Sequence, residues 1–248
     1  MERRPEDRMQ EILGTERDAK MLHRVNATAA DNYYCQGPGE GGSRDIINKI
    51  KQLVGVDVGP SHAVLDVGFG KGHFLREAKG LGCRRVAGVD IAPASIDEFN
   101  GGDHEGYELH CLDMSHSYLP FADDSFDIVA CTETIEHVYN PHFVVAEIKR
   151  ILVPDGIFLM AFPQPEDNFG YGPGQHAHVY PGFLRKDSYE IFMRDRFFRL
   201  EERMPNGSTA WYIHTNYKGE GIIDINEIVS GNYDEAKLFA PVKGRILK

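Results

Sequence analysis

Short apolar runs alternate with amphipathic stretches through the middle of this 248-residue chain. Apolar runs bounded by turn residues predict strands at 62–68, 84–92, 107–113, 125–133 and 156–163. Apolar positions three and four apart predict the intervening helices at 71–82, 93–100 and 141–152. This alternation of strand and helix predicts an α/β fold, in which helices cover both faces of a parallel sheet through right-handed crossovers.

Further elements are predicted on either side of this alternating region. A helix over residues 44–55 can be capped by Ser43 and ended by Gly55. After the fifth strand, a polar connection spans residues 164–182, and segments of that length are usually functional or disordered. The pattern then predicts a helix at 183–196 and two strands at 197–204 and 209–217.

These elements divide the chain into three parts. Residues 1–42 are predicted to form an N-terminal helical cap that ends in a Gly-rich loop containing Tyr33. Residues 43–218 form the core, and the loop at 163–182 within it is the candidate substrate loop. Residues 219–248 are a C-terminal extension without a clear pattern.

Composition narrows the range of partners and locations. The 38 acidic and 27 basic residues give a net charge of −11, which disfavours nucleic acid and anionic membranes as partners. The first residues, MERRPEDRMQ, lack the apolar segment of a signal peptide, and no run reaches the roughly 20 apolar residues of a membrane helix. Four cysteines without CxxC spacing fit a reducing cytoplasm, and we expect Cys111 and Cys131 to be buried thiols.

The most informative stretch is VLDVGFGKGHF, in which Gly68, Gly70 and Gly72 follow a predicted strand and precede a helix. Glycines at such a turn let the backbone bend sharply and let a ligand lie against exposed amides. A nicotinamide dinucleotide fingerprint would require its third glycine at position 73, where this chain has His73. The dinucleotide interpretation is therefore disfavoured.

The same stretch resembles the first motif of the class I S-adenosylmethionine-dependent methyltransferases. Three further segments resemble the family's later motifs in order and spacing: VAGVDIA, LHCLDMSHSYLPFADDSFDIV and VAEIKRILVPDGIFLMAFP. The resemblance extends from about residue 63 to residue 163. It implies a Rossmann-like sheet of seven strands, mostly parallel with the last strand antiparallel, and S-adenosylmethionine as cofactor.

The resemblance also assigns roles to acidic residues at the ends of successive strands. Asp66 would help to hold the amino acid portion of the cofactor, and Asp90, followed by Ile91, would accept hydrogen bonds from the ribose hydroxyls. Asp113 or the Met114 amide would read the adenine edge. Each acid has a local alternative: hydrogen bonds to loop amides, a helix cap and a turn, respectively.

The segment TETIEH, residues 132–137, follows the fourth predicted strand. On a helix, Glu133, Glu136 and His137 would share one face. The resemblance implies that Thr132 or Glu133 touches the methionine end of the cofactor and that His137 faces the substrate, where an imidazole can act as general base. The alternative is a solvated helix start, because the helix dipole favours Glu at that position.

Metal binding is a further alternative for this segment. Glu133, Glu136 and His137, together with His176 or His178 from the long loop, resemble the ligand pattern of small-RNA 2′-O-methyltransferases. Such oxygen and nitrogen ligands suit Mg²⁺, Mn²⁺ or Zn²⁺. We predict no metal, because the net charge of −11 argues against an RNA substrate.

Together these patterns predict methyl transfer from S-adenosylmethionine to a small molecule, with a hydroxyl oxygen as the preferred acceptor. His178 on the long loop is a third catalytic candidate, and Tyr33 would cover the cofactor from the N-terminal cap. Two rival functions are a nicotinamide-dependent oxidoreductase and a cofactor-binding partner subunit without catalysis. The oligomeric state and the identity of the acceptor are left open.

Overall fold

The computed structural model of the chain describes residues 46–115, 117–138, 140–163, 198–203 and 209–215. Several predicted features lie outside these residues: the cap at 1–42 with Tyr33, the loop at 164–182 with His176 and His178, the helix at 183–196 and the extension at 219–248. They stay predictions.

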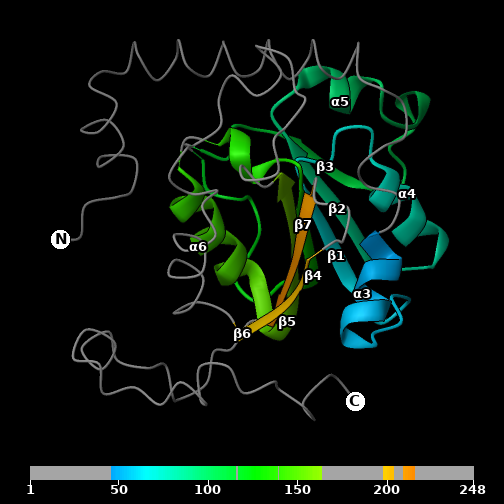
Figure 1. Ribbon diagram of the computed structural model, residues 1–248. Coiled ribbons are helices and arrows are strands. Elements are labelled where there is room, and N and C mark those ends of the chain that lie inside the picture. The colour runs from blue at the N-terminus through cyan, green and yellow to red at the C-terminus, as the bar shows by residue number, and fades with distance from the viewer. Residues whose placement is uncertain (1–45, 116, 139, 164–197, 204–208, 216–248) are drawn as a thin grey trace, which may run out of the picture.

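Five parallel strands form the centre of the fold, in the spatial order β3-β2-β1-β4-β5 (Figure 1). Their bounds are β1 Ala63–Val67, β2 Arg85–Asp90, β3 Glu108–Cys111, β4 Phe126–Thr132 and β5 Leu152–Pro163. The chain reverses its direction of winding between β1 and β4, so the carboxyl ends of β1, β2 and β4 adjoin a topological switch point, where α/β sheets bind ligands. The predicted parallel α/β sheet is confirmed for these strands.

The backbone ladder continues beyond β5. Strand β7 (Thr209–Thr215) pairs antiparallel with β5, and β6 (Phe198–Arg203) pairs antiparallel with β7. The sheet therefore reads β3-β2-β1-β4-β5-β7-β6 through the described residues.

Helices lie on both faces of the sheet. They are α3 Ile46–Val54, α4 His73–Gly80, α5 Pro93–Asp97 and α6 Pro141–Ile151, with 3-10 turns η1 Phe99–Gly102 and η2 Ile135–His137. Figure 1 shows α3 and α4 on one side of the strands and α6 on the other. This is the arrangement that right-handed crossovers produce when strand and helix alternate.

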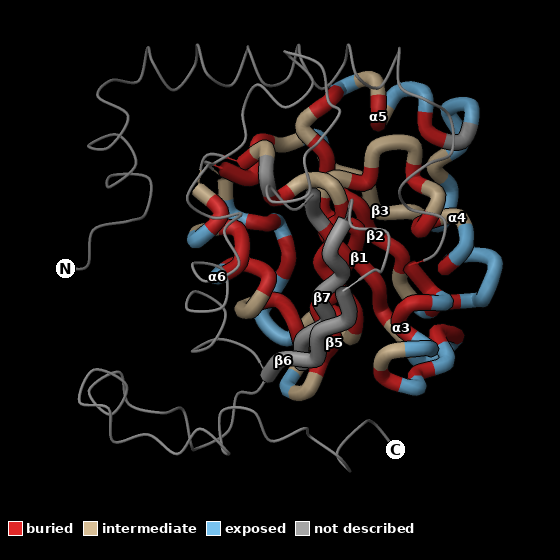
Figure 2. Tube along the Cα trace, in the orientation of Figure 1, coloured by how far each residue is buried: buried red, intermediate tan, exposed pale blue. Residues whose placement is uncertain are grey.

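Two apolar clusters lie between the sheet and its helices. Figure 2 shows buried residues along the central strands. On one face Leu65 and Val67 of β1 belong to a cluster with Val144 and Ile148 of α6. On the other face Val64 of β1 belongs to a cluster with residues of α3 and α4. All five residues of β1 are buried, as expected of a central strand covered on both sides.

Strand β5 begins earlier than its apolar pattern predicts. The ladder starts at Leu152 instead of residue 156 and shifts register between Phe126 and Ile128 of β4. Asp155 has a φ of 61°, so one residue in the left-handed region absorbs the irregularity. The Pro-x-Gly turn at 154–156 therefore lies within the bounds of β5, but it falls between the paired residues Leu152 and Ile157 and has no partner in the register with β4.

Polar contacts fix the amino ends of the central strands. Asp127 Oδ2 accepts hydrogen bonds from the Ala63 amide and from Arg84 Nη2, each at 2.6 Å. These contacts join the starts of β4, β1 and β2 at the edge opposite the carboxyl ends. Cys131 in β4 is buried as predicted, but the expectation for Cys111 is wrong, because it ends an outer strand and is exposed.

Within the described ranges, no helix is both long and apolar enough to cross a membrane.

Candidate cofactor site

The glycine loop leaves β1 in a left-handed backbone conformation that glycine adopts readily. Gly68, Gly70 and Gly72 have φ of 79°, 49° and 68°, in the left-handed region that favours glycine. A Cβ at Gly68 would overlap the Thr134 side chain, and a Cβ at Gly72 would overlap the ring of Phe99. The first and third glycines therefore let neighbouring elements approach the loop closely.

Gly70 differs from the other two glycines. A Cβ built there would meet nothing within 4 Å among the described residues. The Gly70 amide donates a 2.8 Å hydrogen bond to Asp90 Oδ2, which ties the loop to the end of β2. The backbone is consequently bare on one side and anchored on the other, as a surface for close ligand approach requires.

Asp90 is a buried carboxylate at the end of β2, and the structure gives both of its oxygens local partners. Oδ2 accepts from Gly70, and Oδ1 accepts from the Ala92 amide at 2.8 Å. Burial raises the pKa of Asp90, while these amide bonds and one from the Ser95 hydroxyl oppose the increase. The local alternative predicted for Asp90 is thus part of its role, because its carboxylate ties the glycine loop to the start of α5.

Asp66 is the most isolated polar group of the site. It lies in β1 with 1% of its surface exposed, and its Oδ1 has no hydrogen-bond partner among the described residues. Burial, followed by the nearby charge of Asp90, raises the pKa of Asp66 to about 8. A buried oxygen without a donor requires an explanation, and a bound ammonium group or a water would supply that donor. Asp66 therefore fits the cofactor's amino acid portion.

Asp113 begins a compact turn after β3. Its Oδ1 accepts from the Ser115 amide at 2.9 Å, and its carbonyl accepts from the Ser117 amide at 3.0 Å. The Leu112 amide bonds to the Asp90 carbonyl at 2.9 Å, so this turn starts beside the end of β2. Met114 is buried in the cluster that contacts α6, whereas Ile91 is half-buried. The turn predicted as the local alternative exists, and it places Asp113 beside Asp90.

The segment after β4 does not form the α-helix on which Glu133 and His137 would share a face. Thr132 ends β4 and is buried, and Glu133 has a left-handed φ of 51° with its amide bonded to the Ala161 carbonyl at 2.8 Å. Only Ile135–His137 turns, as a 3-10 turn, and the His137 amide donates to the Thr134 carbonyl at 2.9 Å. Glu133 therefore lies outside the turn, because its amide continues the sheet ladder. Both Glu133 and His137 are half-buried.

Thr134 is a residue that the sequence pattern did not single out. Its Oγ1 is the donor in both of its contacts, to the Thr132 carbonyl at 3.0 Å and to the Gly68 carbonyl at 3.4 Å. Together with its close packing over Gly68, these contacts join the ends of β4 and β1. A hydroxyl two residues after a strand is a weak signal by itself, and only the contact with Gly68 gives it significance.

The metal hypothesis is untested by these contacts. Among the described residues, no group of three or more His, Cys, Asp and Glu side chains is arranged to hold a metal ion. The proposed ligand set requires His176 or His178, which lie outside those residues.

Comparison with known proteins shows which proteins this chain resembles. Residues 65–160 match the family model described as a methyltransferase domain. An uncharacterized methyltransferase, YcgJ of Bacillus subtilis, is 32% identical over 114 residues, which are 43% of this chain and 43% of that protein. A ubiquinone biosynthesis O-methyltransferase of Pseudomonas putida is 26% identical over 183 residues, which are 67% of this chain and 76% of that protein.

Solved structures share the fold. A putative methyltransferase of Haloferax volcanii in complex with the Trm112 activator has a TM-score of 0.61 at 20% identity, covering 79% of this chain and 99% of that one. The [4+2]-cyclase SpnF has a TM-score of 0.58 at 17% identity, covering 81% and 97%. An S-adenosylmethionine-dependent methyltransferase of Mesorhizobium loti has a TM-score of 0.54 at 16% identity, covering 68% and 96%.

The motif order, the parallel sheet and the matched domain agree with one another, and the orphaned Asp66 oxygen beside bare backbone fits the family's cofactor, S-adenosylmethionine. Residues 65–160 therefore match a methyltransferase domain, and the sheet around them has the fold of solved S-adenosylmethionine-dependent methyltransferases.

Proposed function

We propose that the chain transfers the methyl group of S-adenosylmethionine to a small-molecule acceptor, with a hydroxyl oxygen as the preferred nucleophile. The observation that carries this proposal is the bare backbone at Gly70, which lies next to the carboxylate of Asp90. The relatives named ubiquinone biosynthesis O-methyltransferase support an oxygen acceptor.

Cofactor binding would use groups at three neighbouring strand ends. Asp90 would accept hydrogen bonds from the ribose hydroxyls, Asp66 would accept one from the ammonium group, and Asp113 or the Met114 amide would contact the adenine. When bound, the cofactor supplies an electrophilic methyl group on a sulfonium. The chain's own contribution is mainly alignment, because holding the reactants in line can lower the activation barrier by several kcal/mol.

We assign the remaining roles at the rim of the sheet. His137 would take the proton of a hydroxyl acceptor, with Glu133 and Thr132 beside the methionine end and His178 on the candidate substrate loop. Tyr33 and the helical cap at 1–42 would cover the cofactor, and the full sheet would be the seven-stranded one of the family. The antiparallel pairing of β7 with β5 supports the last assignment.

The net charge of −11 supports a small molecule over nucleic acid or a membrane surface, and we retain a cytoplasmic location as part of the proposal. The metal-dependent alternative would be removed if a Glu136→Ala variant kept both its metal content and its activity. The non-catalytic alternative would show as tight cofactor binding without turnover on any acceptor.

Two matched glycine variants test cofactor binding. Gly70 and Gly55 both have a left-handed φ, of 49° and 73°, and a Cβ at either would meet nothing within 4 Å among the described residues. Each Gly→Ala change should therefore cost about 1–2 kcal/mol of stability from backbone strain. Only Gly70→Ala should lower the affinity for S-adenosylhomocysteine, by roughly tenfold or more, because its methyl group would occupy the ligand's surface.

Isothermal titration calorimetry with S-adenosylhomocysteine measures both affinities. Gly55, at the end of α3, controls for backbone strain because we place it outside the site. No binding to the unmodified protein at millimolar ligand would refute the proposal. Equal affinity of Gly70→Ala and Gly55→Ala would show that the ligand does not lie against this backbone.

A further inference from the structure

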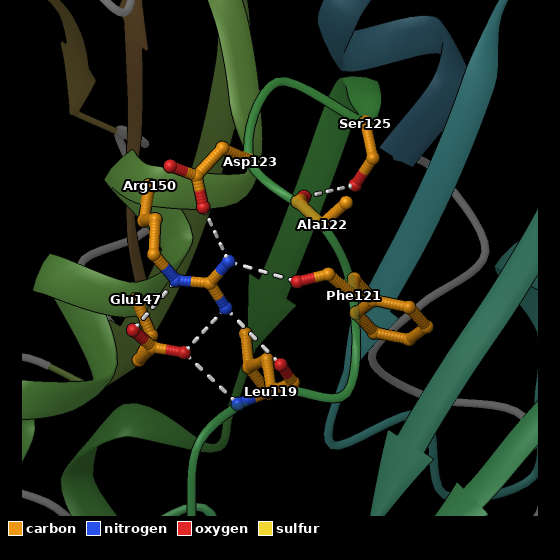
Figure 3. A network of polar contacts seen from close by, with 7 residues as sticks. All are labelled: Leu119, Phe121, Ala122, Asp123, Ser125, Glu147 and Arg150. Atoms are coloured by element: carbon orange, nitrogen blue, oxygen red, sulfur yellow. Dashed lines mark hydrogen bonds and ion pairs between the residues drawn. The ribbon is translucent and has the colours of Figure 1, made fainter.

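Arg150 and Glu147, near the end of α6, form a nearly buried ion pair (Figure 3). Arg150 Nε donates to Glu147 Oε1 at 2.9 Å, and Arg150 Nη2 donates to Glu147 Oε2 at 2.7 Å. The side chains are 28% and 7% exposed, respectively. Such a bidentate ion pair has a defined geometry. A nearly buried carboxylate destabilises the fold unless its oxygens have hydrogen-bond or charged partners.

The remaining donors of Arg150 hold the segment between β3 and β4. Here the β3–β4 segment means residues 112–115 and 117–125. Arg150 Nη1 donates to the Phe121 carbonyl and to Asp123 Oδ1, both at 2.8 Å, and Nη2 donates to the Leu119 carbonyl at 3.1 Å. Nη1 and Nη2 of the guanidinium thus donate to this segment, while Nε donates to Glu147 (Figure 3).

Glu147 contacts Leu119 as well, through the Leu119 amide. Its Oε2 accepts a 3.0 Å hydrogen bond from the Leu119 amide, so both the N–H and the C=O of Leu119 end on the ion pair. Leu119 lies between the end of β3 at Cys111 and the start of β4 at Phe126, where the sheet ladder does not fix the chain. The ion pair therefore replaces the ladder as the support of this segment.

The supported segment also carries the residues assigned to adenine. The Asp113 carbonyl bonds to the Ser117 amide, two residues before Leu119, so the turn and the anchored peptide form one short unit. Met114 and Leu119 are both buried in the apolar cluster that includes Ile148 of α6. A shift of Leu119 would consequently move Asp113 and Met114 relative to Asp90.

We propose that the Arg150–Glu147 pair is a positioning device for adenine recognition, which holds the β3–β4 segment where Asp113 and the Met114 amide meet the adenine ring. This inference rests on the proposed function, because it presumes that the cofactor lies against that segment. Neither residue touches the cofactor; both act through Leu119. In this proposal the pair determines how strongly the site prefers adenine over other bases, while Asp90 contacts the ribose and Asp66 contacts the amino acid portion.

The test compares two ligands that differ at the adenine amino group, S-adenosylhomocysteine and S-inosylhomocysteine. In Arg150→Gln, the affinity for S-adenosylhomocysteine should fall by roughly 3- to 10-fold, the range that the loss of one hydrogen bond produces. The preference for the adenosyl over the inosyl ligand should fall by a similar factor. Glu147→Gln should move the same preference in the same direction, and provides a second variant should Arg150→Gln fail to fold.

The matched control is Arg84→Gln, which breaks the ion pair between Arg84 and Asp127 at the amino ends of the strands. It should leave the ligand preference unchanged within about twofold, since it lies far from the assigned site. A folded Arg150→Gln or Glu147→Gln variant that keeps the unmodified preference would overturn the inference and leave the proposed function standing. Failure of the unmodified protein to bind S-adenosylhomocysteine would overturn both.

Discussion

Asp66 combines deep burial with an oxygen that lacks a donor among the described residues, and burial raises its pKa to about 8. In the unfolded chain the same group ionises near 3.8, so the folded protein holds a proton that the unfolded chain releases between these values. The free energy of unfolding contains a contribution that is complete below about pH 4 and is lost as the pH rises through about 8.

An Asp66→Asn variant should remove this contribution, because the amide does not titrate. The free energy of unfolding of the unmodified protein should fall relative to the variant by up to about 1.4 kcal/mol per pH unit between pH 4 and 8. Urea titrations of the two ligand-free proteins at several pH values measure the difference. A difference that does not depend on pH would mean that Asp66 is ionised in the folded protein.

At the scale of elements, α6 matters because its two ends have separate tasks. Asn140 precedes the helix, and its side-chain oxygen accepts a 3.1 Å hydrogen bond from the Phe143 amide, while Pro141 takes the first helical position. Near the other end, Glu147 and Arg150 hold the β3–β4 segment. The start of α6 therefore contributes to the stability of the fold, and its end supports the segment proposed to contact adenine.

Replacement of Asn140 by Ala should lower the free energy of unfolding by about 1 kcal/mol, because the Phe143 amide loses its side-chain acceptor and keeps the Asn140 carbonyl. A Ser at this position keeps an acceptor and should restore most of the loss. Denaturant titration of the three proteins provides the measurement, and an Asn140→Ala variant as stable as the unmodified chain would contradict the capping role.

For the whole molecule, ligand binding and stability are linked by mass action. S-adenosylhomocysteine at about 100 times its dissociation constant should stabilise the folded state by about 2.7 kcal/mol, which raises Tm by roughly 5–11 °C for a chain of this size. NADH at the same concentration should leave Tm unchanged, because His73 occupies the position of the third glycine of a dinucleotide fingerprint. A shift with NADH and none with S-adenosylhomocysteine would reverse the assignment.

Much of the fold and part of the site could be predicted from the sequence, because the relevant signals are local. Apolar runs placed the five parallel strands close to their observed bounds, and the motif placed Asp66, Gly70 and Asp90 at the ends of β1 and β2. A distant contact decided one alternative that the local pattern left open. On a helix Glu133 would share a face with His137, but its amide bonds to the Ala161 carbonyl of β5.

The sequence by itself determined the alternation of elements, the positions of left-handed glycines and the acids at strand ends, since periodicity and backbone sterics act over a few residues. Only the tertiary structure decided which groups meet: Thr134 over Gly68, the Gly70 amide on Asp90, and Arg150 with the Leu119 peptide. These partners are 20 to 66 residues apart in the chain. Such contacts depend on how whole elements pack, which local spacing does not encode.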